Sequence, residues 1–218
     1  MVKPKLKIVA IVPIKNLRNS KSRLSSILDP FERMVLVNYF FDLTIKKLEK
    51  SSLISEILVI SNTENFQHLS NHKKITNITD HREGVNNAIS TADSYLETQN
   101  IDASLVIPID LPLISSNDIN DLCEISNDFS NGVIICPSKR YDGTNILLRK
   151  PHNIIKTHYD NNSYNNHLLE ARLRNVFVKQ LTYPNLTFDI DTKDDLLSLM
   201  KIGNWKDVFK KIGIKFSV

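Results

Sequence analysis

The sequence predicts an α/β fold, a single domain over residues 1–218 in which a mostly parallel mixed sheet lies between two layers of helices. Short runs of apolar, largely β-branched residues alternate along the chain with longer segments whose apolar residues recur at helical spacing. The runs are apolar at nearly every position, which is typical of parallel strands buried on both faces. A chain of 218 residues is also long enough to bury one sizeable core.

The first predicted strand is the run Ile8-Val9-Ala10-Ile11-Val12, which stops at Pro13. The loop that follows carries four cations, namely Lys15, Arg18, Lys21 and Arg23. Open α/β sheets bind ligands at the carboxyl ends of their strands, and cations there favour a polyanion such as a nucleoside triphosphate. The alternative is a solvated basic loop, whose cations would contribute little to folding. No glycine occurs before Asn77, so side chains are expected to supply the phosphate contacts.

A helix is predicted to begin at Asp29, which forms a capping-box pattern with Glu32 and is followed by a proline in the first turn. The apolar residues expected along it are Phe31, Met34, Val35, Val37, Phe41, Ile45 and Leu48. The next elements are a strand at 57–60, a short polar helix at 64–69 and a weak strand at 75–78.

The alternation continues with a helix at 84–97, a buried strand at 105–109 and a helix capped by Ser115. The second half is less regular, and two apolar runs at 133–136 and 145–148 are separated by a polar loop that would let them pair antiparallel. The remaining expected elements are a helix at 163–174, a strand at 176–181, a helix capped by Thr192 and Asp195, and an amphipathic stretch around Trp205.

Composition narrows the function classes. Hydrophobic residues make up 41% of the chain and charged residues 24%, which is ordinary for a globular protein. The formal charge of +4 suits an anionic small molecule but is too weak to argue for nucleic acid, and no stretch is long enough to span a membrane. Cys123 and Cys136 lack metal-ligand spacing and are expected to be small core residues in a reducing cytoplasm.

Three aspartates follow predicted strands or extended segments. Asp110 ends the apolar run 105–109 and precedes a proline turn, which places it at the carboxyl edge of the sheet. Asp189 and Asp191 alternate with Ile190 in an extended segment, so both carboxylates point to one side. Such a pair is unfavourable without a cation, and Mg²⁺ is the natural candidate. The alternatives are a turn acid for Asp110 and a helix N-terminal acid for Asp191.

Weaker signals lie at three other positions. Gly84 opens a predicted helix and lets the backbone approach a ligand, while Asn86 offers a donor and an acceptor to a base edge. Thr144 follows a glycine turn. Ser163 begins a helix whose free amides can bind a phosphate, although a plain serine N-cap is an equal reading. No zinc-ligand spacing and no nucleophile elbow occur, which favours chemistry without a covalent intermediate.

Six motifs, in this order and over nearly the whole chain, resemble the CofC family of 2-phospho-L-lactate guanylyltransferases in coenzyme F-420 biosynthesis. They are Val12-Pro13-Ile14-Lys15 with Lys21-Ser22-Arg23-Leu24, Glu83-Gly84-Val85-Asn86, Pro108-Ile109-Asp110-Leu111-Pro112-Leu113, Asp142-Gly143-Thr144-Asn145, Ser163-Tyr164 with His167, and Asp189-Ile190-Asp191-Thr192. The resemblance implies a nucleotide-diphospho-sugar transferase-like, Rossmann-like fold. One departure is Asn161-Asn162, where family members usually have glycine or proline before the serine.

The resemblance also implies roles for individual residues. Nucleotide binding would fall to Pro13, Lys15, Lys21, Arg23, Glu83, Gly84 and Asn86. Mg²⁺ would be bound by Asp110, Asp189 and Asp191. The acceptor would be bound by Thr144, Asn145 and Ser163, and the catalytic residues would be Lys21, Arg23 and Asp110.

The implied reaction condenses GTP with (2S)-2-phospholactate to give lactyl-2-diphospho-5'-guanosine and pyrophosphate. Phosphoenolpyruvate and 3-phosphoglycerate are alternative acceptors. Two other functions stay open: a sugar-nucleotide glycosyltransferase, because Asp189-Ile190-Asp191 matches a D-x-D motif, and a non-catalytic nucleotide-binding regulator. The resemblance further implies a homodimer, with possible hand-over of the product to the downstream lactyl-phosphoguanosine transferase. A cytoplasmic location is expected because the N-terminal residues lack the apolar region of a signal peptide.

Overall fold

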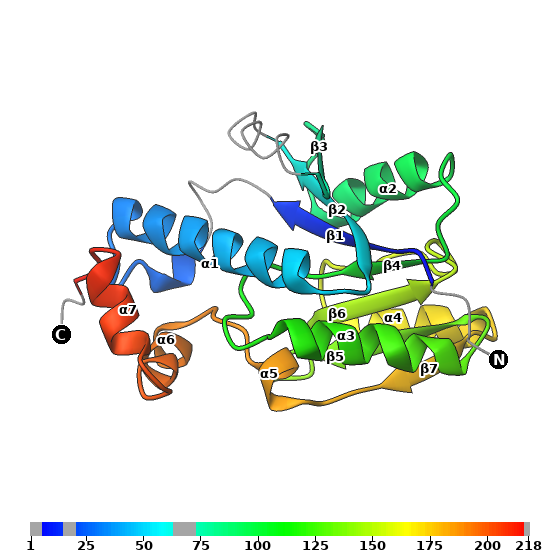
Figure 1. Ribbon diagram of the computed structural model, residues 1–218. Helices are drawn as coiled ribbons and strands as arrows, with labels where there is room; N and C mark the ends of the chain where they lie inside the picture. The colour runs from blue at the N-terminus through cyan, green and yellow to red at the C-terminus, as the bar shows by residue number, and fades with distance from the viewer. Residues whose placement is uncertain (1–5, 15–20, 63–72, 216–218) are drawn as a thin grey trace.

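The apolar runs of the sequence form one seven-stranded sheet in the order β3-β2-β1-β4-β6-β5-β7 (Figure 1). The computed structural model describes residues 6–14, 21–62 and 73–215. Within these ranges the strands are β1 (Ile8–Ile14), β2 (Ile54–Ser61), β3 (Ile75–Thr79), β4 (Ala103–Val106), β5 (Gly132–Pro137), β6 (Thr144–Lys150) and β7 (Phe177–Gln180).

One strand of this sheet runs against the others. β1 pairs parallel with β2 and β4, β2 with β3, and β5 with β7, whereas β6 is antiparallel to both β4 and β5. The predicted antiparallel pair and the mostly parallel mixed sheet are therefore confirmed. Because β6 is reversed, its first residues lie at the edge where the parallel strands end, and Thr144 pairs with Pro137 at the end of β5. This reversal brings Thr144 and Asn145 to the ligand-binding edge.

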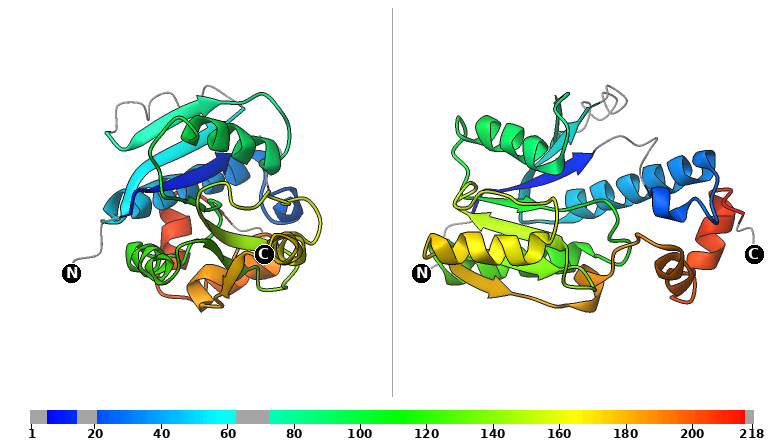
Figure 2. Two further views of the ribbon diagram at one scale, coloured as in Figure 1. Left: turned by 90° about the vertical axis from the view of Figure 1, so that its right-hand side faces the viewer. Right: turned by 180° about the vertical axis from the view of Figure 1, so that it is seen from behind.

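Helices cover both faces of the sheet (Figures 1 and 2). Residues of α1 and α3 pack in the core on one face, and residues of α2 and α4 pack in the core on the other. The helices of the described residues are α1 (Pro30–Lys50), α2 (Val85–Leu96), α3 (Ser116–Ile125), α4 (Ser163–Leu173), α5 (Pro184–Thr187), α6 (Lys193–Leu199) and α7 (Trp205–Lys211), with 3₁₀ turns η1 (Ser22–Leu24) and η3 (Ser126–Asp128).

The predicted caps of three helices are confirmed. Asp29, Ser115 and Thr192 each accept the backbone N–H of the residue three positions on and form a complete capping box. The strand predicted at 105–109 is shorter than expected and ends at Val106, because Pro108 has no N–H to donate to a neighbouring strand. The helix predicted at 64–69 lies outside the described residues.

Helix α1 extends past the sheet and packs on two partners. Its sheet-facing residues, such as Phe41 and Ile45, lie in the core beneath the sheet. Leu36 and Phe40 instead join residues of η1, α6 and α7 in a separate apolar cluster. Phe31, although it keeps the helical spacing of the apolar residues, is 68% exposed in the first turn of the helix. A helix packed on two sides has a wider apolar stripe than single-face spacing indicates.

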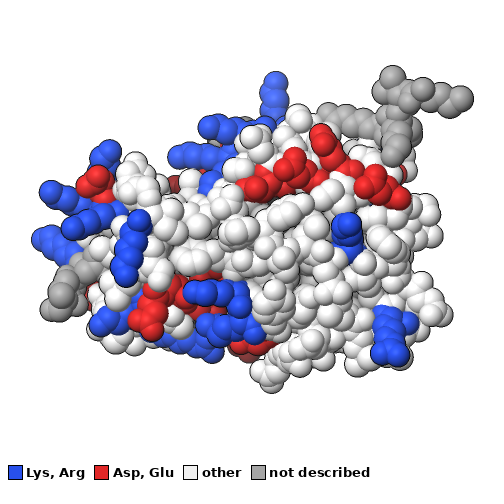
Figure 3. All heavy atoms as spheres, turned by 90° about the horizontal axis from the view of Figure 1, so that it is seen from below, with Lys and Arg blue, Asp and Glu red and all other residues white. Residues whose placement is uncertain are grey.

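The surface carries basic charge at the end formed by the last helices. Seen from below, Lys and Arg side chains gather at the end of the molecule where α7 lies (Figure 3), and α7 itself contains Lys206, Lys210 and Lys211. Part of the net positive charge therefore lies far from the carboxyl edge of the parallel strands. Among the described residues, none of the helices combines the length and apolarity that crossing a bilayer requires. Cys123 and Cys136 are buried and unpaired, as expected.

Candidate functional site

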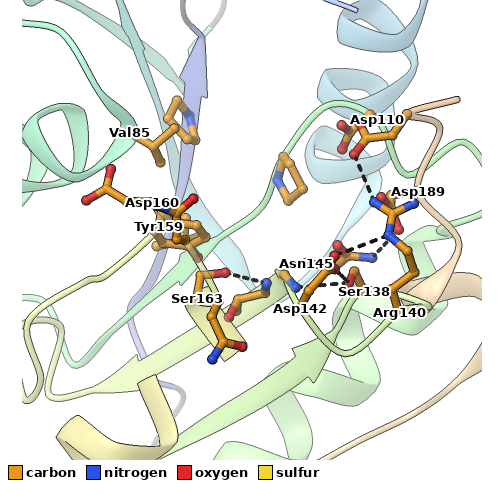
Figure 4. A pocket seen from close by; sticks show the side chains of 18 of the residues that line it. Val85, Asp110, Ser138, Arg140, Asp142, Asn145, Tyr159, Asp160, Ser163 and Asp189 are labelled. Atoms are coloured by element: carbon orange, nitrogen blue, oxygen red, sulfur yellow. Dashed lines mark hydrogen bonds and ion pairs between the residues drawn. The ribbon is translucent and has the colours of Figure 1, made fainter. Parts of the chain in front are cut away.

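Two adjoining cavities, of about 380 and 400 Å³, open at the carboxyl edge of β1 and β4. The first, the hydroxyl lobe, is lined by Ser138, Arg140, Asp142, Thr144, Asn145, Tyr159, Asp160, Ser163 and Asp189 among others (Figure 4). The second, the lysine lobe, is lined by Ile14, Lys21, Ser22, Val37 and Ile109 among others. Both lobes share Pro13, Arg23, Val85, Pro108, Asp110 and Asp191. Two ligands could therefore lie on either side of a common wall of carboxylates.

The three predicted aspartates lie on this wall although they are distant in sequence. Asp110 follows the end of β4, and its backbone carbonyl accepts the N–H of Ile190 at 3.1 Å. Ile190 is fully buried in the apolar cluster under α1, so its neighbours Asp189 and Asp191 face the cleft. One hydrogen bond and one buried isoleucine thus bring both acidic segments together.

Lys21 is held between two of these carboxylates. Its Nζ lies 2.5 Å from Asp110 Oδ2 and 2.8 Å from Asp191 Oδ1, and its side chain is only 10% exposed. Burial opposes its charge, but the two carboxylates outweigh burial and raise the pKa of Lys21. The alternative of a solvated loop cation does not fit Lys21, which is a buried ion-pair partner, and its contribution to folding stays a prediction. Lys15, the other lysine expected here, lies outside the described residues.

Asp191 is the most strongly paired of the three acids. Besides Lys21, the guanidinium groups of Arg23 and Arg140 lie 3.9 and 3.6 Å from Asp191 Oδ2. Burial alone would raise the pKa of Asp191, but the charge and hydrogen bond of Lys21 and the charges of both arginines lower it. Asp191 is therefore fixed as a carboxylate at neutral pH.

Asp189 has no ion-pair partner among the described residues. Its Oδ1 accepts a long hydrogen bond, 3.4 Å, from Asn145 Nδ2, and its own backbone N–H also interacts with the carboxyl group. Burial, followed by repulsion from Asp110 and Asp191, raises the pKa of Asp189 above its usual value. A cation placed against Asp189 would relieve this repulsion.

The acidic wall fits Mg²⁺ by its chemistry. Carboxylate oxygens are the ligands that magnesium prefers, and among the described residues Asp189 has no ion pair within 4 Å although the charge of Arg140 acts on it. Within the described parts of the chain, however, no group of three or more His, Cys, Asp or Glu side chains is gathered as a ready metal cage. The ammonium of Lys21 lies where two of the three expected ligands meet. A bound metal would therefore engage Asp189 and share Asp110 and Asp191 with Lys21.

The opposite side of the hydroxyl lobe is built from buried hydroxyl groups. Ser163 Oγ accepts the backbone N–H of Thr144 at 2.8 Å, and Thr144 Oγ1 lies 2.9 Å from Nδ1 of His167. Thr144 and Ser163 are 6% and 4% exposed. Ser163 is the first residue of α4, a helix whose N-cap, Asn162, makes no side-chain capping bond. The amides of this helix start are therefore not capped by a side chain.

The departure at Asn161-Asn162 is accommodated by backbone conformation. Asn162 lies in the left-handed region with φ 53° and ψ 42°. Asparagine tolerates this region better than other non-glycine residues. Asn162 can therefore enter α4 with a backbone geometry that a glycine would adopt readily.

Arg140 is a cleft residue that the motifs do not indicate. It lies in the turn between β5 and β6, where its Nε is 3.2 Å from Asp142 and its Nη2 is 3.6 Å from Asp191. The available signal was the antiparallel pairing itself, which places the β5–β6 turn at the same edge as Asp110. In Figure 4 the Arg140 side chain lies beside Asp189 on the acidic wall.

The segment predicted to contact the base lies beside the cleft rather than along it. Val85 lines both lobes, whereas Glu83, Gly84 and Asn86 are not among the lining residues. Gly84 has φ +88°, a conformation that favours glycine, at the start of α2. Asn86 donates to Asp160 at 3.0 Å and accepts the N–H of Tyr159 at 2.8 Å. Both polar groups of Asn86 therefore bind the loop that precedes α4.

Comparison with known proteins gives a consistent family. The model of the family described as "Guanylyl transferase CofC like" matches residues 8–218. The chain is 32% identical over 215 residues to a 2-phospho-L-lactate guanylyltransferase of Methanocaldococcus jannaschii, covering 96% of this chain and 91% of the relative. It is 29% identical over 198 residues to a phosphoenolpyruvate guanylyltransferase of Rubrobacter xylanophilus, covering 91% of this chain and 96% of the relative.

Solved structures show the same fold at low identity. A protein assigned as a nucleotide-diphospho-sugar transferase, from Desulfovibrio desulfuricans, superposes with a TM-score of 0.74 at 12% identity and covers 95% of this chain and 94% of its own. A CMP:2-keto-3-deoxy-manno-octonic acid synthetase complexed with CTP superposes with a TM-score of 0.59 at 12% identity, covering 90% of this chain and 100% of its own. The predicted nucleotide-diphospho-sugar transferase-like fold is confirmed.

Proposed function

This chain belongs to the family of CofC-like guanylyl transferases and is thus a nucleotidyltransferase, and we propose that it acts on GTP and (2S)-2-phospholactate. The products are lactyl-2-diphospho-5'-guanosine and pyrophosphate, an intermediate and a by-product of coenzyme F-420 biosynthesis. The acceptor is taken from the relatives named 2-phospho-L-lactate guanylyltransferase, including one of Methanocaldococcus vulcanius that is 34% identical over 215 residues.

The observation that carries this proposal is the two-lobed cleft. The lysine lobe and the hydroxyl lobe share Asp110 and Asp191, so ligands on the two sides would meet at the acidic wall. A nucleotide whose triphosphate reaches Lys21 and Arg23 would present its α-phosphate to this wall. An acid phosphate held by Thr144 and Ser163 would approach from the other side. This opposed arrangement is what in-line attack on phosphorus requires.

The reaction needs positioning and charge more than a proton acceptor. The acceptor phosphate, with a second pKa of about 6, is ionised at neutral pH and needs little general-base help. One of its oxygens forms a bond to the α-phosphorus of GTP, and the bond from that phosphorus to the bridging oxygen of pyrophosphate breaks. Among the residues that the structure describes, no histidine lines either lobe, which is compatible with this chemistry.

Each side of the cleft then has a defined task. Lys21 and Arg23 supply positive charge beside the triphosphate, and Arg140, which lines the hydroxyl lobe, supplies it on the acceptor side, so that two anions can come together. Asp110, Asp189 and Asp191 would hold Mg²⁺, which supplies charge stabilisation at the α-phosphate and the leaving pyrophosphate when bound. Pro13 and Val85 form apolar wall between the lobes. Asn145 donates a hydrogen bond to Asp189, and Glu83 and Gly84 precede Val85, which lines both lobes.

A second acceptor has support of its own. Phosphoenolpyruvate carries the same phosphate and carboxylate as phospholactate, and relatives named phosphoenolpyruvate guanylyltransferase match 91% and 88% of this chain.

The carboxylate of Asp160 also lines the hydroxyl lobe, where Asn86 donates a hydrogen bond to one of its oxygens. The other oxygen of Asp160 would accept a hydroxyl hydrogen. Because 3-phosphoglycerate has a hydroxyl group and phosphoenolpyruvate lacks one, Asp160 would favour 3-phosphoglycerate, the third acceptor.

The test is a product assay with GTP, Mg²⁺ and each acid in turn, namely 2-phospholactate, phosphoenolpyruvate and 3-phosphoglycerate. Pyrophosphate release and the ³¹P signal of a new diphosphate ester are both measured. Formation of both with 2-phospholactate, at the highest kcat/KM of the three, supports the proposal. Release of GDP from a GDP-sugar supplied in place of GTP, with no pyrophosphate formed from GTP, would indicate a glycosyltransferase. GTP binding without turnover for every acid would indicate a regulator.

Assembly and location extend the proposal. We infer that the protein is a cytoplasmic homodimer. We also infer that it passes its product to the downstream lactyl-phosphoguanosine transferase, because a reactive nucleotide diester is best transferred directly. Light scattering of the purified chain tests the dimer. Kinetics of the coupled pair tests the hand-over, since direct transfer leaves no lag before the second product and resists a trap for free intermediate.

A further inference from the structure

His167 lies behind the hydroxyl lobe and has a single defined protonation pattern. It is fully buried on α4, and its Nε2 accepts the backbone N–H of His158 at 2.8 Å. A backbone amide only donates, so Nε2 carries no proton. Burial first, and then the charges of His158 and Arg149, lowers the pKa of His167 to about 3, so the ring is neutral. Its one proton is therefore on Nδ1.

This tautomer fixes the direction of the next hydrogen bond. Nδ1 of His167 lies 2.9 Å from Thr144 Oγ1, so the imidazole donates and the threonine oxygen accepts. The hydroxyl hydrogen of Thr144 must then point elsewhere. Ser163 is in the same condition, because its oxygen accepts the backbone N–H of Thr144 at 2.8 Å.

Both hydroxyl groups are left as donors toward the cavity. Within the described parts of the chain neither O–H meets a protein acceptor, although Thr144 and Ser163 are more than nine-tenths buried and line the hydroxyl lobe. Two buried donors without acceptors match an oxyanion with several lone pairs. The uncapped start of α4 adds amide donors on the same side.

We propose that His167 is a positioning residue for the acceptor, which it serves by holding the Thr144 hydroxyl as a donor to the phosphate or carboxylate in the hydroxyl lobe. The chain of donors runs from the backbone N–H of His158 through His167 to Thr144 and on to the anion. This inference rests on the proposed function for the identity of the anion. It gives His167 a role although the ring does not line the cavity.

A matched pair of substitutions separates donation from packing. In His167→Asn the side-chain NH₂ can take the place of Nδ1–H and still donate to Thr144, while the acceptor for His158 is lost. In His167→Gln the side-chain oxygen can take the place of Nε2 and still accept from His158, while the donor to Thr144 is lost. Both changes remove the buried ring, and His167→Asn, whose side chain is one methylene shorter, loses more packing than His167→Gln.

The expected result is a difference in KM for 2-phospholactate. His167→Gln raises this KM by about tenfold to a hundredfold, the usual range for a hydrogen bond to a charged group, and leaves the KM for GTP nearly unchanged. His167→Asn keeps the KM for 2-phospholactate near the wild-type value, even if its melting temperature is lower. If both variants raise the two KM values together, in step with their loss of melting temperature, His167 is a structural residue and the proposal is wrong.

Thr144 provides a second route if the His167 variants fold poorly. Thr144→Val keeps the shape and removes the hydroxyl, and Thr144→Ser restores it. We expect Thr144→Val to match His167→Gln in its KM for 2-phospholactate and the double variant to be no worse, because both remove one donor. Additive losses would contradict a shared pathway. Nitrogen-15 NMR of the wild-type imidazole adds a direct check: a proton on Nε2 rather than Nδ1 overturns the inference.

Binding of inorganic phosphate, measured by calorimetry on the wild type and both His167 variants, separates the two proposals. If the wild type transfers no guanylyl group to any acid but His167→Gln alone weakens phosphate binding, the proposed function fails and the positioning role stands. If the wild type is active and His167→Gln changes neither phosphate binding nor the KM for 2-phospholactate, the positioning role fails and the function stands.

Discussion

The acidic wall and the hydroxyl side of the cleft would both bind anionic substrates, but in opposite ways. The acidic wall consists of Asp110, Asp189 and Asp191, which are charged and need cations beside them. The hydroxyl side consists of neutral donors whose oxygens are already satisfied by the protein. Without its ligand the first arrangement has like-charge repulsion at Asp189, whereas the second lacks only acceptors for two neutral hydroxyl donors. The acidic wall should therefore respond strongly to metal and salt, and the hydroxyl side should respond mainly to the acceptor.

Within the acidic wall, the pKa values of Asp189 and Asp191 shift in opposite directions. Burial and the neighbouring carboxylates raise the pKa of Asp189, so its ionisation at neutral pH works against folding. The pairing of Asp191 with Lys21 lowers its pKa, so its ionisation favours folding. The stability from Asp191 is present above its unfolded pKa of about 4 and is lost as pH falls through its folded pKa. One wall thus contains both a stabilising and a destabilising carboxylate.

Removal of magnesium should have the largest effect. Chelation with EDTA is expected to abolish guanylyl transfer, and added Mg²⁺ should restore it, because the metal would neutralise charge on the α-phosphate and pyrophosphate. Magnesium should also raise the melting temperature of the wild type in the absence of substrates, since a ligand that binds only the folded state stabilises it. Full activity after exhaustive chelation would remove the metal from the account.

Asp189→Asn should separate activity from stability. The variant is expected to lose about a hundredfold to a thousandfold in kcat, while its melting temperature at neutral pH stays equal or rises as the like-charge repulsion is removed. Its melting temperature should no longer respond to magnesium. Steady-state kinetics and thermal unfolding with and without Mg²⁺ provide the measurements.

Asp191→Asn is the matched control for Asp189→Asn, because only the buried Ile190 separates the two aspartates in the sequence. It is expected to lose activity as well, but to melt below the wild type, since the ion pairs with Lys21 and the arginines are weakened. Equal changes of melting temperature in the two variants would contradict the difference inferred between these carboxylates.

Lys21→Ala should lower kcat/KM for GTP by about a hundredfold through loss of charge beside the triphosphate. It should also lower the stability of the fold by about 2 kcal/mol, because Asp110 and Asp191 lose a buried charged partner. Chemical denaturation gives the second value. Lys21→Met is the control for loss of the aliphatic stem. Unchanged stability would indicate that Lys21 is a solvated loop cation, the alternative that the sequence alone leaves open.

Arg23→Lys should have the smallest effect among these changes. The Arg23 side chain is 69% exposed and its guanidinium lies 3.9 Å from Asp191, so loss of the guanidinium should leave stability unchanged. A severalfold increase in the KM for GTP is expected because the lysine keeps the charge but loses the planar fork that binds phosphate at two points. A wild-type KM in this variant would indicate that Arg23 does not contact the nucleotide.

The acidic wall was largely predictable from local sequence, since an acid after an apolar strand and a D-x-D segment both indicate a sheet edge. The partners of Lys21 were not, because they are 89 and 170 positions away in the chain. The two-sided packing of α1 and the cleft position of Arg140 depend equally on distant elements. The capping boxes were predicted well because each depends on residues three positions apart.

The hydroxyl side was less predictable for the same reason. Thr144 and Ser163 could be proposed from a turn and a helix start, but the direction of their hydrogens depends on a histidine tautomer that only the backbone of His158 fixes. Asn86 shows the converse case. A residue expected to read a base edge uses both polar groups to hold the loop before α4, and a role toward the nucleotide stays a prediction.

Two-substrate kinetics of Lys21→Ala and Ser163→Ala, measured side by side, tests the division of the cleft most directly. Ser163→Ala should raise the KM for 2-phospholactate and leave that for GTP nearly unchanged, and Lys21→Ala should raise the KM for GTP with a much smaller change for 2-phospholactate. This crossed pattern is predicted because each variant removes a contact on one side of the acidic wall. If Ser163→Ala changes the KM for GTP as much as the KM for 2-phospholactate, the two sides do not bind separate substrates.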